Sequence, residues 1–312
     1  MRVVSLLPAA TEWIRAFDGE HLLVGCTHAC RQPGALPVLT RSLVDGSDSA
    51  GGIDSRVQEV LATGKSLFIV DEDRLRALEP DVVIVQDLCA VCSVSGDALG
   101  SRLANFARPP AVVAFSPASL KQVLTEALAL ARHLRILPAA MRYIAAREKE
   151  LAHLRANIGI ERDGSLRHVA RPRTLLLEWV DPPMTAGHWI PDMVEKVGGE
   201  PLRGAAGGQS TRITWEAVDR ANPDIVIVAA CGRTVPETQA DMIEQPGWRA
   251  TRSWQTKRAW IIDARTYVTM PGPSIYRAMA LLASVIHPQC VPSIADAWEL
   301  QPVASAAGYK EA

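Results

Sequence analysis

Two segments of this chain repeat one pattern, which constrains the fold more than any other feature. They run from Pro80 to Cys89 (PDVVIVQDLC) and from Pro223 to Cys231 (PDIVIVAAC). Each begins with Pro-Asp, continues as an apolar β-branched run and ends at a cysteine, and such runs are typical of buried parallel strands. Because ligands of open α/β sheets bind beyond the carboxyl ends of the strands, the pattern predicts two related lobes that each present sulfur at a binding edge.

The segment between the two lobes predicts a helical connection. From about residue 119 to 156 it is rich in Ala, Leu and Arg, with apolar residues at helical spacing and an interruption at Pro138. We therefore expect an α/β fold of two Rossmann-like lobes with parallel sheets, a long rigid helix joining them and a ligand cleft between them. The expected bounds are 1–117 for the N-terminal lobe, 118–160 for the connecting helix, 161–300 for the C-terminal lobe and 301–312 for a disordered tail.

Charge and hydropathy exclude several classes of function. The formal net charge is −1, and no basic stripe of the kind that binds nucleic acid is present. No apolar run reaches the ~20 residues of a membrane span, so the protein is not expected to be embedded in a membrane. A strand pattern begins at Val3 with no leader before it, which predicts a cytoplasmic protein with reduced cysteines.

Four of the six cysteines are candidates for a metal site. Cys89 and Cys92 follow one predicted strand, Cys30 lies in another strand-end loop, and Cys231 belongs to the second lobe. Thiolates that converge on a cleft suit zinc, another metal ion or an iron–sulfur cluster. Two alternatives remain open, namely a redox dithiol at Cys89 and Cys92 and inert buried thiols, the class expected for Cys26 and Cys290.

Three residues of the second lobe are candidates for contacting a flat ligand. Trp179 and Trp189 offer wide apolar faces, and His188 is a potential metal ligand. The alternatives are ordinary packing for the tryptophans and a hydrogen bond to backbone for His188. No Gly-x-Ser-x-Gly, Walker or His-Glu-x-x-His motif is present, so no catalytic residue is expected.

The order of several short motifs resembles one family, the helical-backbone substrate-binding proteins for vitamin B12, iron siderophores and haem. The motifs are Ser5–Glu12 (SLLPAATE), Ala186–Met193 (AGHWIPDM) with Gly198-Gly199, and Pro246-Gly-Trp248. A leaderless, cobalamin-binding-protein-like branch of this family is indicated more narrowly by Thr27–Cys30, Gln86–Cys92 and Ala230–Gly232.

The resemblance implies an intracellular binding protein for a cobalamin-type corrinoid or a related metal-containing ligand. It implies contacts from Trp179, His188 and Trp189 in one lobe, and from Gln86, Asp87 and the Cys89/Cys92 loop in the other. The usual partner of this family is a membrane importer related to ABC transporters. The alternative function is an iron–sulfur or other metal-centre protein, a redox or sulfur-handling enzyme, that uses Cys30, Cys89, Cys92 and Cys231.

Overall fold

The computed structural model divides the chain into two compact units. Unit 1 comprises Met1–Asp48, Gly52–Pro117 and Lys121–Ala145, and unit 2 comprises Ser49–Gly51, Ala118–Leu120 and Ala146–Ala312. The structure describes residues 1–86, 99–100, 103–161, 164–166, 171–202, 204, 207–293 and 295–303. The predicted site residues Asp87, Cys89 and Cys92 lie outside these ranges.

Unit 1 is built on a four-stranded sheet in which every strand pair is parallel. The strands, in spatial order, are β2 (Leu23–Cys26), β1 (Val3–Ser5), β5 (Val82–Val85) and β6 (Ala111–Ala114). Strand β5 is the first of the two repeated segments, and its four residues are all buried. The continuous apolar run therefore forms a buried parallel strand, as the sequence predicts.

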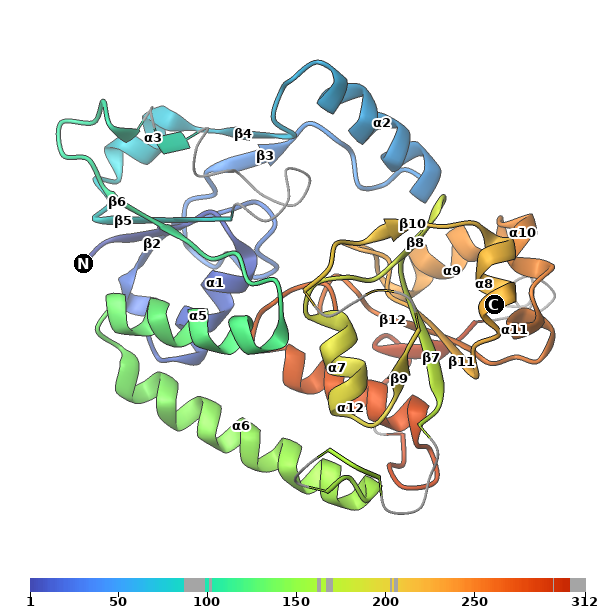
Figure 1. Cartoon of the computed structure of the whole chain (residues 1–312). Coiled ribbons are helices and arrows are strands. Elements are labelled where there is room, and N and C mark those ends of the chain that lie inside the picture. Colours follow the sequence, from blue (N-terminus) through green and yellow to red (C-terminus); the bar gives the residue numbers. More distant parts are fainter. Residues whose placement is uncertain are drawn as a thin grey trace. The chain divides into compact units, whose positions relative to one another are not determined.

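Helices cover this sheet, and a small second sheet accompanies it (Figure 1). Leu75 of α3 belongs to a buried apolar cluster with Val4 of β1 and Val83 of β5. Pro8 begins α1 directly after β1, where its missing N–H costs no hydrogen bond. The remaining elements of the region are α1 (Pro8–Ala16), η1 (Glu20–Leu22), α2 (Ala50–Ala62), α3 (Glu72–Ala77) and α5 (Leu120–His133), with an antiparallel pair of β3 (Thr40–Ser42) and β4 (Phe68–Val70).

Unit 2 is built on a seven-stranded sheet with a parallel centre and antiparallel edges. Strand β7 (Arg173–Val180) pairs in parallel with β11 (Ile225–Val228) and with β9 (Glu200–Pro201), and β11 pairs in parallel with β12 (Ala259–Ile262). The antiparallel strands are β8 (Pro183–Thr185), β10 (Thr211–Arg212) and β13 (Leu300–Pro302). The helices of this unit are α7 (Ile190–Lys196), α8 (Trp215–Ala221), α9 (Val235–Ile243), α10 (Pro246–Arg249), α11 (Arg252–Gln255) and α12 (Ile275–Ile286).

The parallel strands of the two units follow the same order. In unit 1 the order is β2-β1-β5-β6, and in unit 2 it is β9-β7-β11-β12. The first strand of each set therefore lies between the second and the third, which makes a topological switch point beside it. The repeated segments form the third strand in both units, so the predicted α/β class with two Rossmann-like sheets is confirmed.

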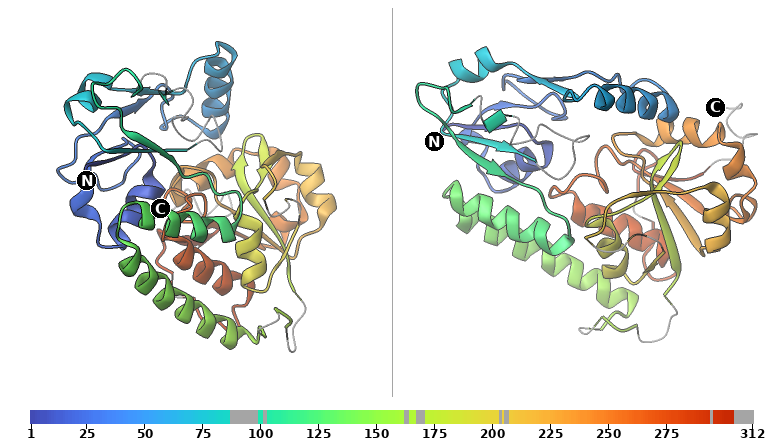
Figure 2. Two further views of the ribbon diagram at one scale, coloured as in Figure 1. Left: turned by 60° about the vertical axis from the view of Figure 1, so that its left-hand side comes forward. Right: turned by 45° about the horizontal axis from the view of Figure 1, so that its top comes forward.

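The predicted connecting helix is two helices. Helix α5 ends at His133, and α6 (Leu137–Ile158) is continuous over 22 residues (Figure 2). Arg135 lies between them with φ of 62°, a left-handed conformation that no helix interior accepts. Pro138 is the second residue of α6, a position that tolerates proline, so it begins the second helix and does not kink a single long one. The predicted cleft stays a prediction.

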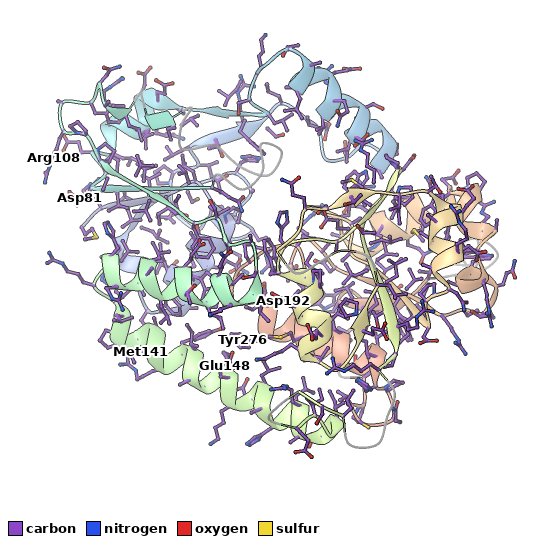
Figure 3. All side chains as sticks on the ribbon, viewed as in Figure 1. Asp81, Arg108, Met141, Glu148, Asp192 and Tyr276 are labelled. Atoms are coloured by element: carbon purple, nitrogen blue, oxygen red, sulfur yellow. The ribbon has the colours of Figure 1, made fainter. Side chains whose placement is uncertain are left out.

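The segment that follows β7 returns to it as a strand. Residues 183–185 return as β8 against β7, although prolines at 182 and 183 argue against a strand in sequence terms. The part of α6 that belongs to unit 2 contacts α12 there, because the hydroxyl of Tyr276 donates to Glu148 Oε1 at 3.0 Å (Figure 3). None of the described helices has the length and apolarity that crossing a bilayer requires.

A buried carboxylate holds the segment around β13 in unit 2. Glu299 is 3 % exposed, and it accepts hydrogen bonds from Arg277 Nη2 at 2.6 Å, from the Tyr267 hydroxyl at 2.7 Å and from the backbone N–H of Asp296 at 2.9 Å. The hydrogen bond from Arg277 is the main reason why the pKa of Glu299 falls from 4.5 to about 2. Each of these donors favours the charged carboxylate.

The contribution of Glu299 to stability is expected to depend on pH. Because its pKa is lower in the folded state, the contribution is complete above about pH 4.5 and is lost as the pH falls toward about 2. Its size is ~3 kcal/mol. Urea unfolding of the wild type and of Glu299→Gln should differ by most of this amount at pH 6, and the difference should shrink steadily below pH ~4.5. A difference that stays constant down to pH 3 contradicts the prediction.

Candidate ligand-binding site

In unit 1, a polar cluster lies at the carboxyl end of β2. The hydroxyl of Thr40 is within 2.8 Å of the Thr27 hydroxyl and 2.7 Å of His28 Nδ1, and it accepts the backbone N–H of His28 at 3.0 Å. The His28 ring also contacts Phe68, with 5.7 Å between the ring centroids. Partial burial lowers the pKa of His28 below its ordinary value, so the ring is neutral at pH 7. These contacts hold the exposed His28 in one orientation.

Two cysteines flank this cluster. Cys26 ends β2 and is fully buried, while Cys30 is 8 % exposed and its thiol lies 3.4 Å from the hydroxyl of Thr11 in α1. The Cys26 thiol hydrogen-bonds to Cys30 and so lowers the pKa of Cys30 to about 7, while burial acts in the opposite direction. The same contact raises the pKa of Cys26. The described contacts of Cys30 are therefore with Cys26, Thr11 and the backbone of Thr27.

Gln86 lies beside the switch point of unit 1. It follows β5 directly and is 4 % exposed. The next residues of the same strand end, Asp87, Cys89 and Cys92, lie outside the described residues. Gln86 and Cys30 are thus at carboxyl ends of strands of one parallel sheet, which is the edge that binds ligands in open α/β folds.

In unit 2, His188 is the predicted residue with the best-defined geometry. Its backbone N–H donates to the Gly208 carbonyl at 2.7 Å, and its carbonyl accepts the N–H of Gly207 at 3.0 Å. It holds a φ of 55°, which for a residue other than glycine usually reflects a constraint from its surroundings. At Gly187, a Cβ atom would lie 2.6 Å from the Gly208 carbonyl oxygen, so only glycine permits this close approach of the two segments.

The side chain of His188 is also held in place. Its ring stacks on Trp189 with 5.9 Å between the centroids and 29° between the planes. Burial lowers the pKa of His188 below its ordinary value, so the imidazole is neutral at pH 7. Nδ1 is shielded from solvent and has no hydrogen-bond partner among the described residues. Within the described residues, Nδ1 therefore does not make the hydrogen bond to backbone that is the alternative interpretation for His188.

The two tryptophans of the prediction have extensive contacts with the protein itself. Trp189 is 5 % exposed, and its Nε1 donates to the carbonyl of Val268 at 3.0 Å. Trp179 is half-buried, packs against the core of unit 2 and donates from Nε1 to the carbonyl of Asp181 at 3.0 Å. The Trp189 contact joins the loop that carries His188 to the loop after β12. Trp189 is therefore a buried residue that holds the ring of His188 by stacking. Trp179 remains partly exposed to solvent.

Cys231 is exposed at the carboxyl end of β11, beside the switch point of unit 2. Its backbone N–H donates to the Glu178 carbonyl at 2.9 Å. Next to it, Arg265 donates to the Gly232 carbonyl at 3.1 Å and forms an ion pair with Glu237 at 3.0 Å. The Arg265–Glu237 ion pair was not identified in the sequence analysis. The local sequence feature that could have pointed to Glu237 is the capping box from Thr234 to Glu237, which begins a helix just after the strand.

The predicted cysteine centre stays a prediction. Cys30 belongs to unit 1 and Cys231 to unit 2, and Cys89 and Cys92 lie outside the described ranges. Among the residues that the structure describes, no group of three or more His, Cys, Asp or Glu side chains is arranged to hold a metal ion. The iron–sulfur alternative thus gains no support from the described geometry.

Known structures share this fold over nearly the whole chain. A periplasmic heme-binding protein from Pseudomonas aeruginosa superposes with a TM-score of 0.69 and 18% identity, over 97% of this chain and 98% of the other. The periplasmic vitamin B12 binding protein of Vibrio cholerae has a TM-score of 0.62 and 15% identity, over 91% and 96% of the two chains. A periplasmic heme-binding protein from Roseiflexus sp. RS-1 has a TM-score of 0.61 and 22% identity, over 93% and 98%.

The sequence itself matches one family model. No curated protein matches the chain significantly, and the identities to the solved structures are low enough to show the fold alone. The model named "Periplasmic binding protein" matches residues 3–266, which include the repeated strands of both units and the loop of His188. The chain therefore belongs to the periplasmic binding protein family.

Proposed function

We propose that this chain binds a cobalamin-type corrinoid or a related metal-containing tetrapyrrole, and that His188 donates a ring nitrogen to the metal of that ligand. The family binds small molecules, and among the solved structures of the same fold are a vitamin B12 binding protein and heme-binding proteins. A planar metal complex with an open axial position takes a neutral imidazole as a ligand. The observation that carries the proposal is the ring of His188, which is partly exposed, stacked on Trp189 and neutral at pH 7.

The backbone and ring contacts of His188 explain why this residue suits the role. A metal ligand binds tightly when its orientation is set before the ligand arrives, because less conformational entropy is then lost on binding. Gly207 and Gly208 fix the backbone of His188 on both sides, and Trp189 fixes the plane of its ring. Contacts that orient a metal-binding side chain in this way typically change metal affinity by ~10–100-fold. Exposed Cys231 and the Arg265–Glu237 pair occupy the carboxyl edge of the same sheet.

The proposal is tested by titrating the full chain with hydroxocobalamin and, separately, with hemin, and following the visible spectrum. We expect saturable binding of at least one of the two, with a spectral shift of the kind that a nitrogen axial ligand produces. His188→Ala should weaken binding by ~10-fold or more. His153, an exposed residue of α6, provides the matched control, and His153→Ala should bind as the wild type does.

A further variant separates metal ligation from stacking. His188→Phe keeps a flat ring beside Trp189 and removes both nitrogens. We expect it to lose the spectral shift and to bind as weakly as His188→Ala. If His188→Phe retains wild-type affinity, the ring contacts the ligand without ligating its metal. If neither cobalamin nor hemin is retained by the wild type after desalting, the proposed function is wrong.

A further inference from the structure

The thiols of Cys26 and Cys30 lie in direct contact at the carboxyl end of β2. The backbone N–H of Cys30 donates to the Thr27 carbonyl at 3.1 Å, so the chain turns back after the strand. This turn brings the Cys30 thiol to the Cys26 thiol, and the two are hydrogen-bonded to each other. Both cysteines are free thiols in the structure. A disulfide needs two cysteines that lie close together, and the contact between these two thiols brings their sulfur atoms together.

The two thiols differ in their access to solvent. Cys30 is 8 % exposed, whereas Cys26 is fully buried. A reagent that approaches from solvent therefore meets Cys30 first and finds Cys26 directly behind it. Closure of a dithiol by thiol–disulfide exchange needs two thiols with different roles. One thiol attacks the external disulfide, and a neighbouring thiol resolves the mixed disulfide.

We propose that Cys26 and Cys30 form an oxidisable dithiol that reacts with small disulfides and closes to an intramolecular disulfide. In the first step the Cys30 thiolate attacks one sulfur of the small disulfide, forms a mixed disulfide and releases one equivalent of thiolate. In the second step the Cys26 thiolate attacks the Cys30 sulfur and releases the second equivalent. The protein loses two electrons and two protons, and the small disulfide is reduced to two thiols.

The closure changes the contacts of the candidate edge in unit 1. In the reduced protein the Cys30 thiol donates to the Thr11 hydroxyl at 3.4 Å. The disulfide has no thiol hydrogen, so this contact with α1 is lost. The bond also closes a ring around Thr27 and His28, whose side chains contact Thr40. The proposed dithiol therefore lies at the carboxyl edge of the sheet of unit 1, and it does not depend on the identity of any ligand.

Peptide mapping of the full chain tests this proposal. The protein is incubated without oxygen with cystamine, then blocked with iodoacetamide and digested with trypsin. The tryptic peptide Ala16–Arg31 (AFDGEHLLVGCTHACR) contains Cys26, Cys30 and no other cysteine. We expect this peptide to lack both alkyl groups and to be lighter than its reduced form by two hydrogen atoms. Reduction with dithiothreitol before blocking should restore both alkylation sites.

Single variants identify the attacking thiol. In Cys26→Ser the mixed disulfide of Cys30 cannot be resolved, so the peptide should retain one cysteamine group. In Cys30→Ser the buried Cys26 should stay unmodified. Cys290→Ser is the matched control and should leave closure of the peptide unchanged. The proposal is overturned if both thiols of the wild type remain open to alkylation after treatment, or if Cys30 is joined to a cysteine outside this peptide.

Discussion

Replacing Asp241 with alanine is expected to lower the free energy of unfolding by ~3–5 kcal/mol. Asp241 and Arg233 form an ion pair at 2.6 Å, and their side chains are 5 % and 6 % exposed. The variant removes the carboxylate that pairs with the buried Arg233 guanidinium, and loss of the partner of a buried charge is costly. Urea unfolding followed by circular dichroism measures the change. A loss below ~1 kcal/mol, the range of exposed pairs, contradicts the prediction.

A double variant separates the cost of a lone charge from the net value of the pair. Replacing both partners, as in Arg233→Met with Asp241→Leu, removes the pair and leaves no buried charge, so most of the lost stability should return. Recovery should stop short of the wild type, because Asp241 Oδ1 also accepts the backbone N–H of Ala50 at 3.0 Å within unit 2. The double variant loses that hydrogen bond, at a cost of ~1–3 kcal/mol.

The exposed ion pair nearby provides a control. Arg265 and Glu237 lie 3.0 Å apart, but their side chains are 47 % and 33 % exposed. Solvent screens this pair, so Arg265→Met should cost less than ~1 kcal/mol. Both arginines belong to the loops that follow β11 and β12, since the carbonyl of Arg233 accepts the N–H groups of residues 264 and 265. We therefore expect the burial of the side chains, more than the distance between the charged atoms, to set how much each ion pair contributes to stability.

The repeated segments predicted the two sheets because each of them marks a buried strand in the parallel part of its sheet. Val82–Val85 and Ile225–Val228 are each the third strand of an equivalent parallel order. A buried strand of this kind is apolar at every position, so a single sequence reveals it. The short antiparallel strands of unit 2 are different. Residues 183–185 and 300–302 are too short for an alternating pattern, and they pair only because the chain returns to the sheet.

The candidate site was only partly predictable, because its decisive contacts are not local in sequence. The motif around His188 marked this residue, yet its fixed backbone depends on Gly207 and Gly208, about twenty residues away. Cys26 was expected to be inert, and its burial agrees with that, but its contact with Cys30 arises from a turn that the spacing alone did not reveal. Arg265 approaches Gly232 from a different strand end, and no local pattern indicates that meeting.

The tryptophans differ widely in their exposure to solvent, which identifies those that serve the core. Trp13 and Trp248 are fully buried, and Trp215 is 9 % exposed, whereas Trp298 is 53 % exposed. The abundance of tryptophan alone is compatible with a surface for a flat ligand. In unit 2, however, Trp248 lies between Trp215 and Trp254, with ring centroids 5.7 Å and 6.2 Å apart. These three residues form a structural cluster.

Replacing Trp248 with alanine is expected to lower the free energy of unfolding by ~3–5 kcal/mol, because it opens a large cavity in the core of unit 2. The ring contacts Trp215 and Trp254 would be lost together. Gly247 shows how tight this region is, since a Cβ atom there would lie 2.5 Å from Trp215 Cδ1. The region around Trp248 is therefore closely packed, and the cost of a cavity there depends on how far its neighbours can relax into it. The measurement is urea unfolding at pH 7.

Trp248→Phe distinguishes the apolar contribution of the ring from that of its N–H group. Trp248 Nε1 has no hydrogen-bond acceptor among the described residues, so phenylalanine removes no such bond and should recover more than half of the stability lost in the alanine variant. The same variant should bind cobalamin or hemin with wild-type affinity, because Trp248 is fully buried and does not reach solvent. If Trp248→Phe unfolds as easily as Trp248→Ala, a polar contact of the indole stabilises this core. If it folds normally but loses the ligand, the tryptophan cluster belongs to the binding site.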